Sequence, residues 1–130
     1  MISKFKIGDT QTFVRKVEQA HIAQFESGKV HDFYGTFALG QDAEWASRLF
    51  VLEMLEDDEE GIGTYLTVKH KSPALVGQRV EITATIEELF ENKINCSYVA
   101  KVGARVVANG TTGQMILKKS EIEKIRERAK

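Results

Sequence analysis

The sequence predicts an α+β domain in which one long helix packs against an antiparallel sheet. First, Gln41–Asp58 has the pattern of a helix, and its segment Leu49–Leu55 is apolar on nearly every side, so the helix should be buried. Second, several later segments alternate apolar and polar residues with a period of two, as half-buried strands do. Third, short turns join these strands, which is typical of antiparallel neighbours. One helix on one sheet makes a two-layer domain.

Length and composition limit the class of protein. The chain has 130 residues, 42% hydrophobic and 28% charged, which fits a single globular domain spanning residues 1–130. A net charge of -1 gives no reason to expect nucleic acid or a membrane surface as a partner. No apolar run is long enough to span a membrane, and the N-terminus lacks the apolar region of a signal peptide. The lone Cys96 cannot form an internal disulfide, so we expect a cytoplasmic location.

The region before the helix is expected to contain one strand and one irregular segment. Thr10–Ala23 begins with alternation and predicts the first strand. Phe25–Gly40 is rich in aromatic residues and predicts a loop or short helical turns. Phe33, Tyr34 and Phe37 in this segment either cover a pocket as a lid or fill the core as ordinary apolar side chains.

The boundaries of the helix follow from its polar residues. Asp42 suits the N-cap position and Glu44 suits the first turn. The acidic run Glu56–Glu60 should leave the core and enter solvent. Because the helix is apolar on more sides than one sheet can cover, a second subunit is expected to cover the remainder.

The second half of the sequence predicts four strands and a terminal helix. Pro73 ends the first of these strands, and residues 91–93 form a hairpin turn. Gly110 and Gly113 predict a bulge or bend in the last strand. The predicted strands are Thr64–Lys71, Val80–Phe90, Ile94–Val102 and Arg105–Lys118, followed by a charged helix at Ser120–Lys130.

Two titratable residues interrupt apolar patterns. Glu53 lies within the apolar helical segment, where a carboxylate is costly unless it is hydrogen-bonded or faces a wet cleft. Desolvation should raise its pKa unless donors compensate. His70 lies on the same strand face as Leu66 and Val68, away from the lysines. Each residue also has a simpler interpretation: Glu53 on a solvent-facing stripe of the helix, and His70 as a core histidine bonded to backbone.

Other common sites find no support in the sequence. His21 and His31 are expected on the surface or in loops. The three histidines and one cysteine show no close spacing of metal ligands, so no metal site is predicted. The chain has no G-x-G-x-x-G, P-loop or G-x-S-x-G motif.

Three segments together resemble the fluoroacetyl-CoA thioesterase branch of the hotdog thioesterases. They are GTYLTVKHKSPALVGQRVEITATIEEL, the helical RLFVLEML and the late strand ANGTTGQMIL. The resemblance covers about residues 9–117. It implies a hotdog fold, in which an antiparallel sheet wraps one central helix, and it implies a homodimer or higher homo-oligomer.

The resemblance also implies roles for individual residues. The catalytic Glu and His of that branch fall on Glu53 and His70 in this register. A threonine expected eight residues before the Glu falls on Trp45, and a histidine of the last strand falls on Thr112. The substrate-binding positions implied are Trp45, Ala46, Phe33, Thr112 and Gly110, with backbone N–H groups near Ala43–Ala46 holding the developing oxyanion.

The function implied is hydrolysis of a small or medium acyl-CoA, with coenzyme A as part of the substrate and no other cofactor. Glu53 would attack the carbonyl or activate water, and His70 would transfer protons. One alternative is a module that binds acyl-CoA or acyl carrier protein without cleaving it, which the replacement of threonine by Trp45 favours. A dehydratase or hydratase ranks below both, because the chain lacks a His–Asp helix motif of that type.

Overall fold

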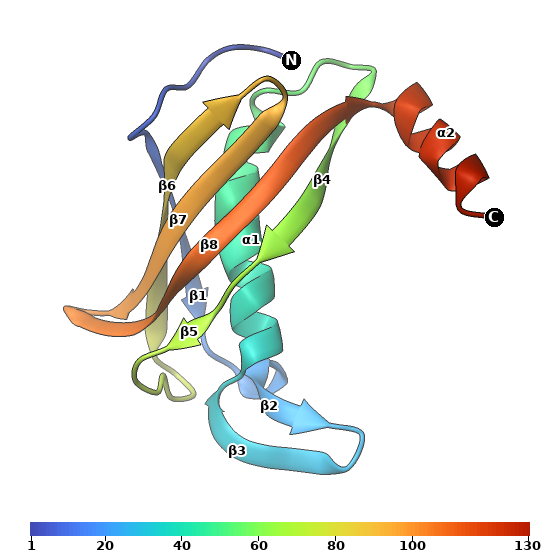
Figure 1. Cartoon of the computed structure of the whole chain (residues 1–130). Coiled ribbons are helices and arrows are strands. Elements are labelled where there is room, and N and C mark those ends of the chain that lie inside the picture. The colour runs from blue at the N-terminus through green and yellow to red at the C-terminus, as the bar shows by residue number, and fades with distance from the viewer.

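The computed structural model describes residues 1–130 and shows a curved antiparallel sheet wrapped around one long helix (Figure 1). This arrangement confirms the predicted α+β hotdog architecture. No helix is both long and apolar enough to cross a membrane. The elements are β1 (Thr10–Lys16), the short 3-10 helix η1 (Gln19–His21), β2 (Ile22–Phe25), β3 (Gly28–Tyr34), α1 (Thr36–Leu52), β4 (Glu59–Leu66), β5 (Lys69–His70), β6 (Arg79–Phe90), β7 (Lys93–Val102), β8 (Arg105–Lys118) and α2 (Lys119–Arg128).

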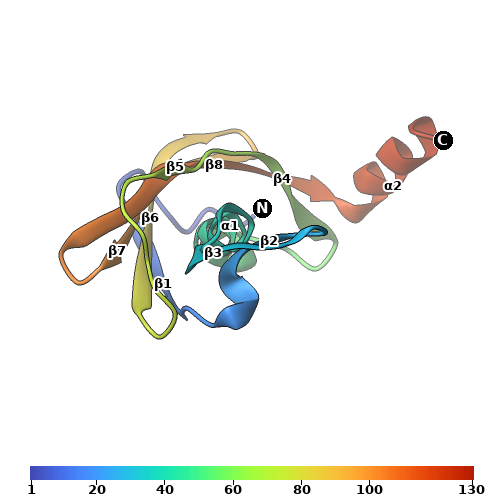
Figure 2. The same ribbon diagram turned by 90° about the horizontal axis from the view of Figure 1, so that it is seen from below.

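The main sheet has the strand order β1-β6-β7-β8-β4, and β5 continues the β4 edge by pairing with β8. Every pair is antiparallel. Figure 2 shows α1 inside the concave side of the sheet and α2 projecting away from it. The hairpin β2–β3 forms a separate two-stranded sheet beside the N-terminal end of α1 (Figures 1 and 2).

The core lies between α1 and the sheet, and the predicted alternation explains it. Along β6, Val80, Ile82, Ala84 and Ile86 are all fully buried, while the residues between them are exposed or half-buried. The helix adds Leu39, Ala43, Ala46, Phe50 and Val51 from its sheet-facing side. Burial of these side chains supplies the main stabilising free energy of the fold.

The helix begins and ends five to six residues earlier than predicted. It runs over Thr36–Leu52, with Gly35 at the N-cap and Glu53 at the C-cap. The segment Phe25–Gly40, predicted as irregular, therefore contains most of the β2–β3 hairpin and the first turn of α1. The N-cap has no capping side chain, so the true start carries none of the usual sequence signals.

Asp42, predicted as the N-cap, is instead buried within α1 in an ion pair. Arg15 on β1 donates two hydrogen bonds to its carboxylate, each 3.0 Å long, and the Tyr34 hydroxyl donates a third. Burial, together with the hydrogen bond to Asp42, raises the pKa of Tyr34 above its ordinary value. These contacts hold β1, the end of β3 and the first half of α1 together.

The edge formed by β4 and β5 bends where it passes over Gly110 of β8. The Thr67 carbonyl accepts a hydrogen bond of 2.6 Å from the Tyr98 hydroxyl. A Cβ atom on Gly110 would lie 2.0 Å from this same carbonyl oxygen. The predicted irregularity near Gly110 and Gly113 thus occurs mainly in the opposite strand, whose register shifts between Gly63 and Tyr65. The predicted strand Thr64–Lys71 is accordingly divided into β4 and β5.

We expect Asp42→Ala to lower the free energy of unfolding by about 2–3 kcal/mol, because it leaves Arg15 and the Tyr34 hydroxyl without their partner. The value is below the ~3–5 kcal/mol typical of a fully buried pair because Arg15 keeps access to solvent. Urea unfolding measures the change. Asp57→Ala removes an exposed carboxylate and is the matched control, expected within about 0.5 kcal/mol of the parent. Equal stability of the two variants would contradict the role of the ion pair.

Candidate functional site

The edge strand runs along one stripe of helix α1. Residues four apart share a face of a helix, and this stripe contains Thr36, Gly40, Glu44 and Arg48. Space beside Gly40 is occupied by Leu66 and Val68, and the guanidinium of Arg48 donates to the Gly61 carbonyl. The predicted inward face of the strand therefore does face the helix. The last residue on that face is His70.

His70 meets Thr36 at the first turn of the helix. The Thr36 Oγ1 and His70 Nε2 atoms are 2.8 Å apart and hydrogen-bonded. Which atom donates depends on the tautomer of the imidazole. Both side chains remain exposed, because β5 is at the sheet edge and Thr36 is at the helix end. The histidine is thus at the rim of the helix–sheet packing rather than in the core.

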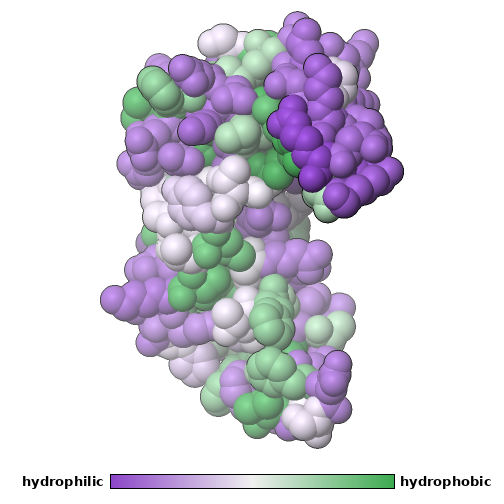
Figure 3. Space-filling view, turned by 45° about the vertical axis from the view of Figure 1, so that its right-hand side comes forward, coloured by the Kyte–Doolittle hydropathy of each residue, from purple (hydrophilic) through white to green (hydrophobic).

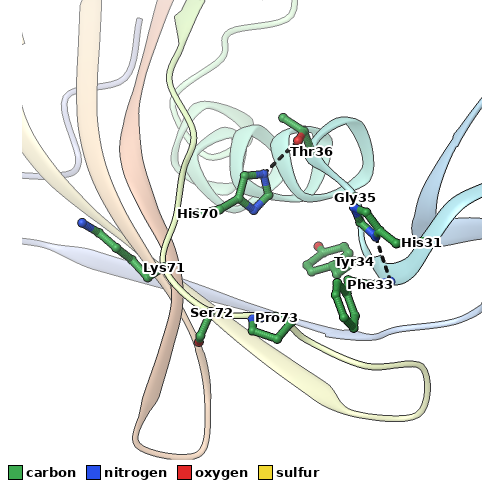
Figure 4. Close-up of a pocket in the computed structure, with 9 residues that line it drawn as sticks. All are labelled: His31, Phe33, Tyr34, Gly35, Thr36, His70, Lys71, Ser72 and Pro73. Carbon is green, nitrogen blue, oxygen red and sulfur yellow. Dashed lines mark hydrogen bonds between the residues drawn. The ribbon is translucent and has the colours of Figure 1, made fainter.

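A cavity of about 350 Å³ opens beside this pair (Figure 4). Thr36 and His70 form one side, and His31, Phe33 and Tyr34 at the end of β3 form the opposite side. His31 Nδ1 accepts a hydrogen bond of 3.1 Å from the backbone N–H of Phe33, so a neutral His31 carries its proton on Nε2. The remaining walls come from Gly35 and from residues 71–73, and the Lys71 side chain points away from the cavity.

Helix α1 directs its N-terminal end at the same place. The first backbone N–H groups of a helix lack partners within it, and here no side chain caps them. The Gly35 N–H is already used, since it donates to the His21 carbonyl. The free donors therefore begin at Thr36 and Phe37, where the positive end of the helix dipole also favours negative charge. Ala43–Ala46, predicted to hold an oxyanion, lie in mid-helix, where the N–H groups bond to preceding carbonyls.

Glu44 is a half-buried carboxylate on the same helical stripe. It lies against Gly63 of β4, since a Cβ atom on that glycine would be 2.6 Å from Glu44 Oε1. No protein hydrogen bond or ion pair satisfies the carboxylate in this chain. Two helical turns, about 12 Å along the axis, separate Glu44 from Thr36.

Glu53 is exposed to solvent, as the simpler interpretation of the sequence expected, and it does not lie in an apolar pocket. This residue is the C-cap of α1, and its exposed carboxylate accepts hydrogen bonds from Lys4 at 2.6 Å and Gln11 at 3.1 Å. The hydrogen bond from Lys4 lowers the pKa of Glu53, so the donors outweigh the desolvation that would otherwise raise it. Seventeen helical positions, about 25 Å, separate it from Thr36, so Glu53 does not meet His70 within the protomer.

The predicted substrate-binding residues are spread over the molecule. Phe33 lines the Thr36–His70 cavity, but Trp45 lies on a different surface, beside Arg15 and Arg48. Ala46 faces the core and is fully buried. The buried Thr112 hydroxyl donates a 2.7 Å hydrogen bond to Ser47, and Gly110 lies under the Thr67 carbonyl. None of Trp45, Ala46, Thr112 and Gly110 lines the cavity.

Thr36 and Glu44 are the candidate residues that the sequence interpretation missed. The spacing that the family resemblance supplied, a threonine eight residues before the glutamate, fits Thr36 and Glu44. The same spacing counted back from Glu53, the glutamate in the more apolar segment, reaches Trp45. The sequence therefore contains a signal for Thr36 and Glu44 as well as the register that places the glutamate at Glu53.

No group of three or more histidine, cysteine, aspartate or glutamate side chains gathers in a way that would hold a metal ion. The groups that the structure brings to the cavity are a hydroxyl, an imidazole and the N-terminal donors of a helix. Such a set can polarise a carbonyl, activate an attacking oxygen and transfer a proton.

Comparison with known proteins identifies the family and the fold. The family model described as FlK, fluoroacetyl-CoA-specific thioesterase, matches residues 17–120. A search of curated proteins finds no match. A hypothetical protein of Thermus thermophilus, a thioesterase superfamily member, is 31% identical, with a TM-score of 0.92 and coverage of 98% of this chain and 95% of that one.

Two further solved structures share the fold at lower identity. The fluoroacetyl-CoA thioesterase FlK is 18% identical, with a TM-score of 0.87 over 96% of this chain and 98% of its own. Structures of its variants contain acetyl-CoA, or fluoroacetate and CoA. A 1,4-dihydroxy-2-naphthoyl-CoA thioesterase from Synechocystis is 18% identical, with a TM-score of 0.67 over 85% and 83% of the two chains. The family match over most of the chain, joined to the 31% identical structure, shows that this chain belongs to the fluoroacetyl-CoA-specific thioesterase family of hotdog-fold proteins.

Proposed function

We propose that this protein hydrolyses the thioester bond of an acyl-coenzyme A, with Thr36 and His70 at the reacting carbonyl. The observation that carries the proposal is the 2.8 Å hydrogen bond between Thr36 Oγ1 and His70 Nε2 at the start of α1. A hydroxyl and an imidazole within hydrogen-bond distance are the arrangement expected of a nucleophile and its base. Membership of a thioesterase family supports the thioester as the substrate.

The chemistry follows from the positions of these groups. His70 accepts a proton from the attacking oxygen, which is either the Thr36 hydroxyl or a water molecule hydrogen-bonded to the imidazole. The free N–H groups at Thr36 and Phe37 stabilise the negative charge that develops on the carbonyl oxygen. The protonated imidazole then donates to the departing thiolate of coenzyme A. When the Thr36 hydroxyl attacks, the product is an acyl ester of Thr36, which a water molecule that gives its proton to His70 then hydrolyses, and His70 returns the proton to the Thr36 oxygen. Mass spectrometry after rapid quenching distinguishes the two attacking oxygens: an acyl group on Thr36 is expected only if the Thr36 hydroxyl, rather than water, attacks the carbonyl.

Glu44 is the carboxylate that we assign to the site, through a homodimer. The outer side of β4 is an unpaired sheet edge with Tyr65 and Leu66 exposed on it. When two such edges pair antiparallel about a two-fold axis, residues at equal distances from the axis come opposite each other. An axis between Gly63 and His70 brings Glu44 of one protomer toward the Thr36–His70 pair of the other. A carboxylate there orients the imidazole and stabilises its protonated form.

The remaining elements of the proposal come from the sequence. We expect no cofactor besides the coenzyme A of the substrate, no nucleic-acid or membrane partner, and a cytoplasmic location. Binding of acyl-CoA or acyl carrier protein without cleavage is the alternative. The replacement of threonine by Trp45, which favoured that alternative, loses its force because Thr36 stands eight residues before Glu44.

We expect His70→Ala and Glu44→Gln each to lower kcat/KM for acyl-CoA by about 10²–10⁴-fold, because each removes a group that moves or stabilises a proton. Thr36→Ala should lower kcat/KM by a similar factor. Thr36→Ser should retain more of the activity because it keeps the hydroxyl. Thiol release from a panel of acyl-CoA esters measures the rates.

Glu53→Gln is the matched control for Glu44→Gln, since it changes a second glutamate of the same helical region outside the cavity. We expect its turnover to equal that of the parent. Loss of activity in Glu53→Gln with full activity in Glu44→Gln would reverse the assignment. A parent protein that binds acyl-CoA in calorimetry but releases no thiol would establish the non-catalytic alternative.

The shared site predicts recovery of activity in mixed dimers. Light scattering should show at least two chains per particle. If the inactive Glu44→Gln and His70→Ala chains are co-expressed and pair at random, half of the dimers are mixed and each mixed dimer has one intact site. About a quarter of the parent activity should therefore return. No recovery, with mixed dimers verified by differential tags, would show that Glu44 and His70 do not act across the interface.

A further inference from the structure

A second cavity adjoins the Thr36–His70 cavity and shares part of its wall. Its volume is about 440 Å³, and His31, Gly35 and Thr36 line both cavities. Thr36 therefore stands at the junction between the two. A thioester whose carbonyl lies at this junction has one arm in each cavity, because the carbonyl carbon carries the acyl group on one side and sulfur on the other.

The two cavities differ in their chemistry. Seven of the eleven residues that line the second cavity are hydrophobic, compared with two of nine in the first. The apolar lining includes the smaller residues Ala20, Ile22 and Ala23 and the larger residues Phe25, Val30 and Phe37. The more polar cavity suits the amide-bearing arm of coenzyme A, and the apolar cavity suits a hydrocarbon acyl group.

Large apolar side chains around the second cavity remain open to solvent. Phe37 is 73% exposed, Val30 60% and Phe25 58%, and the rings of Phe25 and Phe37 contact each other edge to face at 5.6 Å. In Figure 3 hydrophobic atoms gather at the lower end of the molecule, where Figure 1 places the β2–β3 hairpin, whereas the region of α2 is hydrophilic. Burial of this apolar surface by a ligand is favourable.

The size of the cavity argues against a two-carbon acyl group. Such a group is comparable to a few water molecules, each of which occupies about 30 Å³, and it would leave most of the 440 Å³ unfilled. Unfilled space beside a ligand forfeits contacts that a longer chain would make. The cavity is within the range of volumes that accommodate larger organic ligands.

We infer that the second cavity binds the acyl group of the substrate, and that this protein prefers apolar acyl groups of about six carbons or more to acetyl and its small analogues. This inference rests on the proposed thioester hydrolysis. The preference for the acyl group is determined by contact of the acyl chain with Phe25, Val30 and Phe37. These three side chains take no part in the proton transfers at His70.

The test is a series of thioesters: acetyl-, butanoyl-, hexanoyl-, octanoyl- and phenylacetyl-CoA. Each buried methylene is worth up to about fourfold in kcat/KM, so octanoyl-CoA should exceed acetyl-CoA by at least about tenfold. The double variant Phe25→Ala with Phe37→Ala should lower the octanoyl-to-acetyl ratio by at least about threefold. Phe90→Ala removes a ring that is 64% exposed at the distant β6–β7 turn, and it should keep the parent ratio.

Filling the cavity gives a second, independent measurement. Ala20 is exposed on the short helix η1 and lines the cavity, so Ala20→Trp should lower the octanoyl-to-acetyl ratio without a change in the core. Ala104→Trp, at the exposed β7–β8 turn, is the matched control. Equal rates for acetyl- and octanoyl-CoA, or a ratio unaffected by both cavity variants, would overturn the inference while leaving thioester hydrolysis intact.

Failure of the proposed function gives a different result. If no ester in the series is hydrolysed, binding of the ethyl and octyl thioethers of coenzyme A, which cannot be hydrolysed, is measured by calorimetry. Tighter binding of the octyl thioether by about tenfold or more, lost in Ala20→Trp, supports the acyl cavity without catalysis. Equal affinity for the two thioethers would overturn the inference.

Discussion

The path of the edge strand formed by β4 and β5 depends on its close contact with Gly110 of β8, a residue that has no side chain. The Thr67 carbonyl occupies the space that a Cβ atom on Gly110 would need, and the Tyr98 hydroxyl holds it there. At this point the edge bends between β4 and β5 and continues along helix α1. The pairing of His70 with Ala108 then leaves the imidazole at the first turn of the helix. The close approach at Gly110 thus contributes to the path of the edge strand that carries the imidazole.

The start of helix α1 combines three properties in one place. Thr36 is the first helical residue, so its hydroxyl, the free backbone donors and the positive end of the helix dipole are adjacent. Gly35 permits this arrangement, because a Cβ atom there would lie 2.9 Å from the backbone of Ala23. Tyr34, one residue earlier, is anchored to Asp42 and through it to Arg15. The fold therefore positions the site from both sides of Gly35.

The parts that the sequence predicted well are those controlled by local alternation. The strands at residues 80–90, 94–102 and 105–118 agree with the structure within one residue at each end, because burial on one face imposes a period of two. The predicted start of α1 was too late, because the true N-cap, Gly35, has no capping side chain, whereas Asp42 is of a residue type that usually caps a helix. The apolar neighbours of Glu53 in the chain do not reveal that Leu52 beside it is exposed or that Lys4 reaches it from a distant segment. His70 could be identified from its strand face, but its contact with Thr36 could not, since that contact joins residues 34 positions apart.

The hairpin β2–β3 has a consequence for how this protein could change over evolutionary time. It belongs to a separate two-stranded sheet. Its backbone hydrogen bond to the rest of the fold lies at its base, where Tyr34 donates to Ala74, and the Phe25 ring adds an edge-to-face contact with Phe37 of α1. Its outer residues, including Phe25 and Val30, contribute nothing to the main core. Insertions, deletions and replacements at its tip therefore carry little thermodynamic penalty. A lineage can alter this loop repeatedly while the scaffold and the groups at the helix start remain fixed, so diversification within the fold is expected to concentrate there.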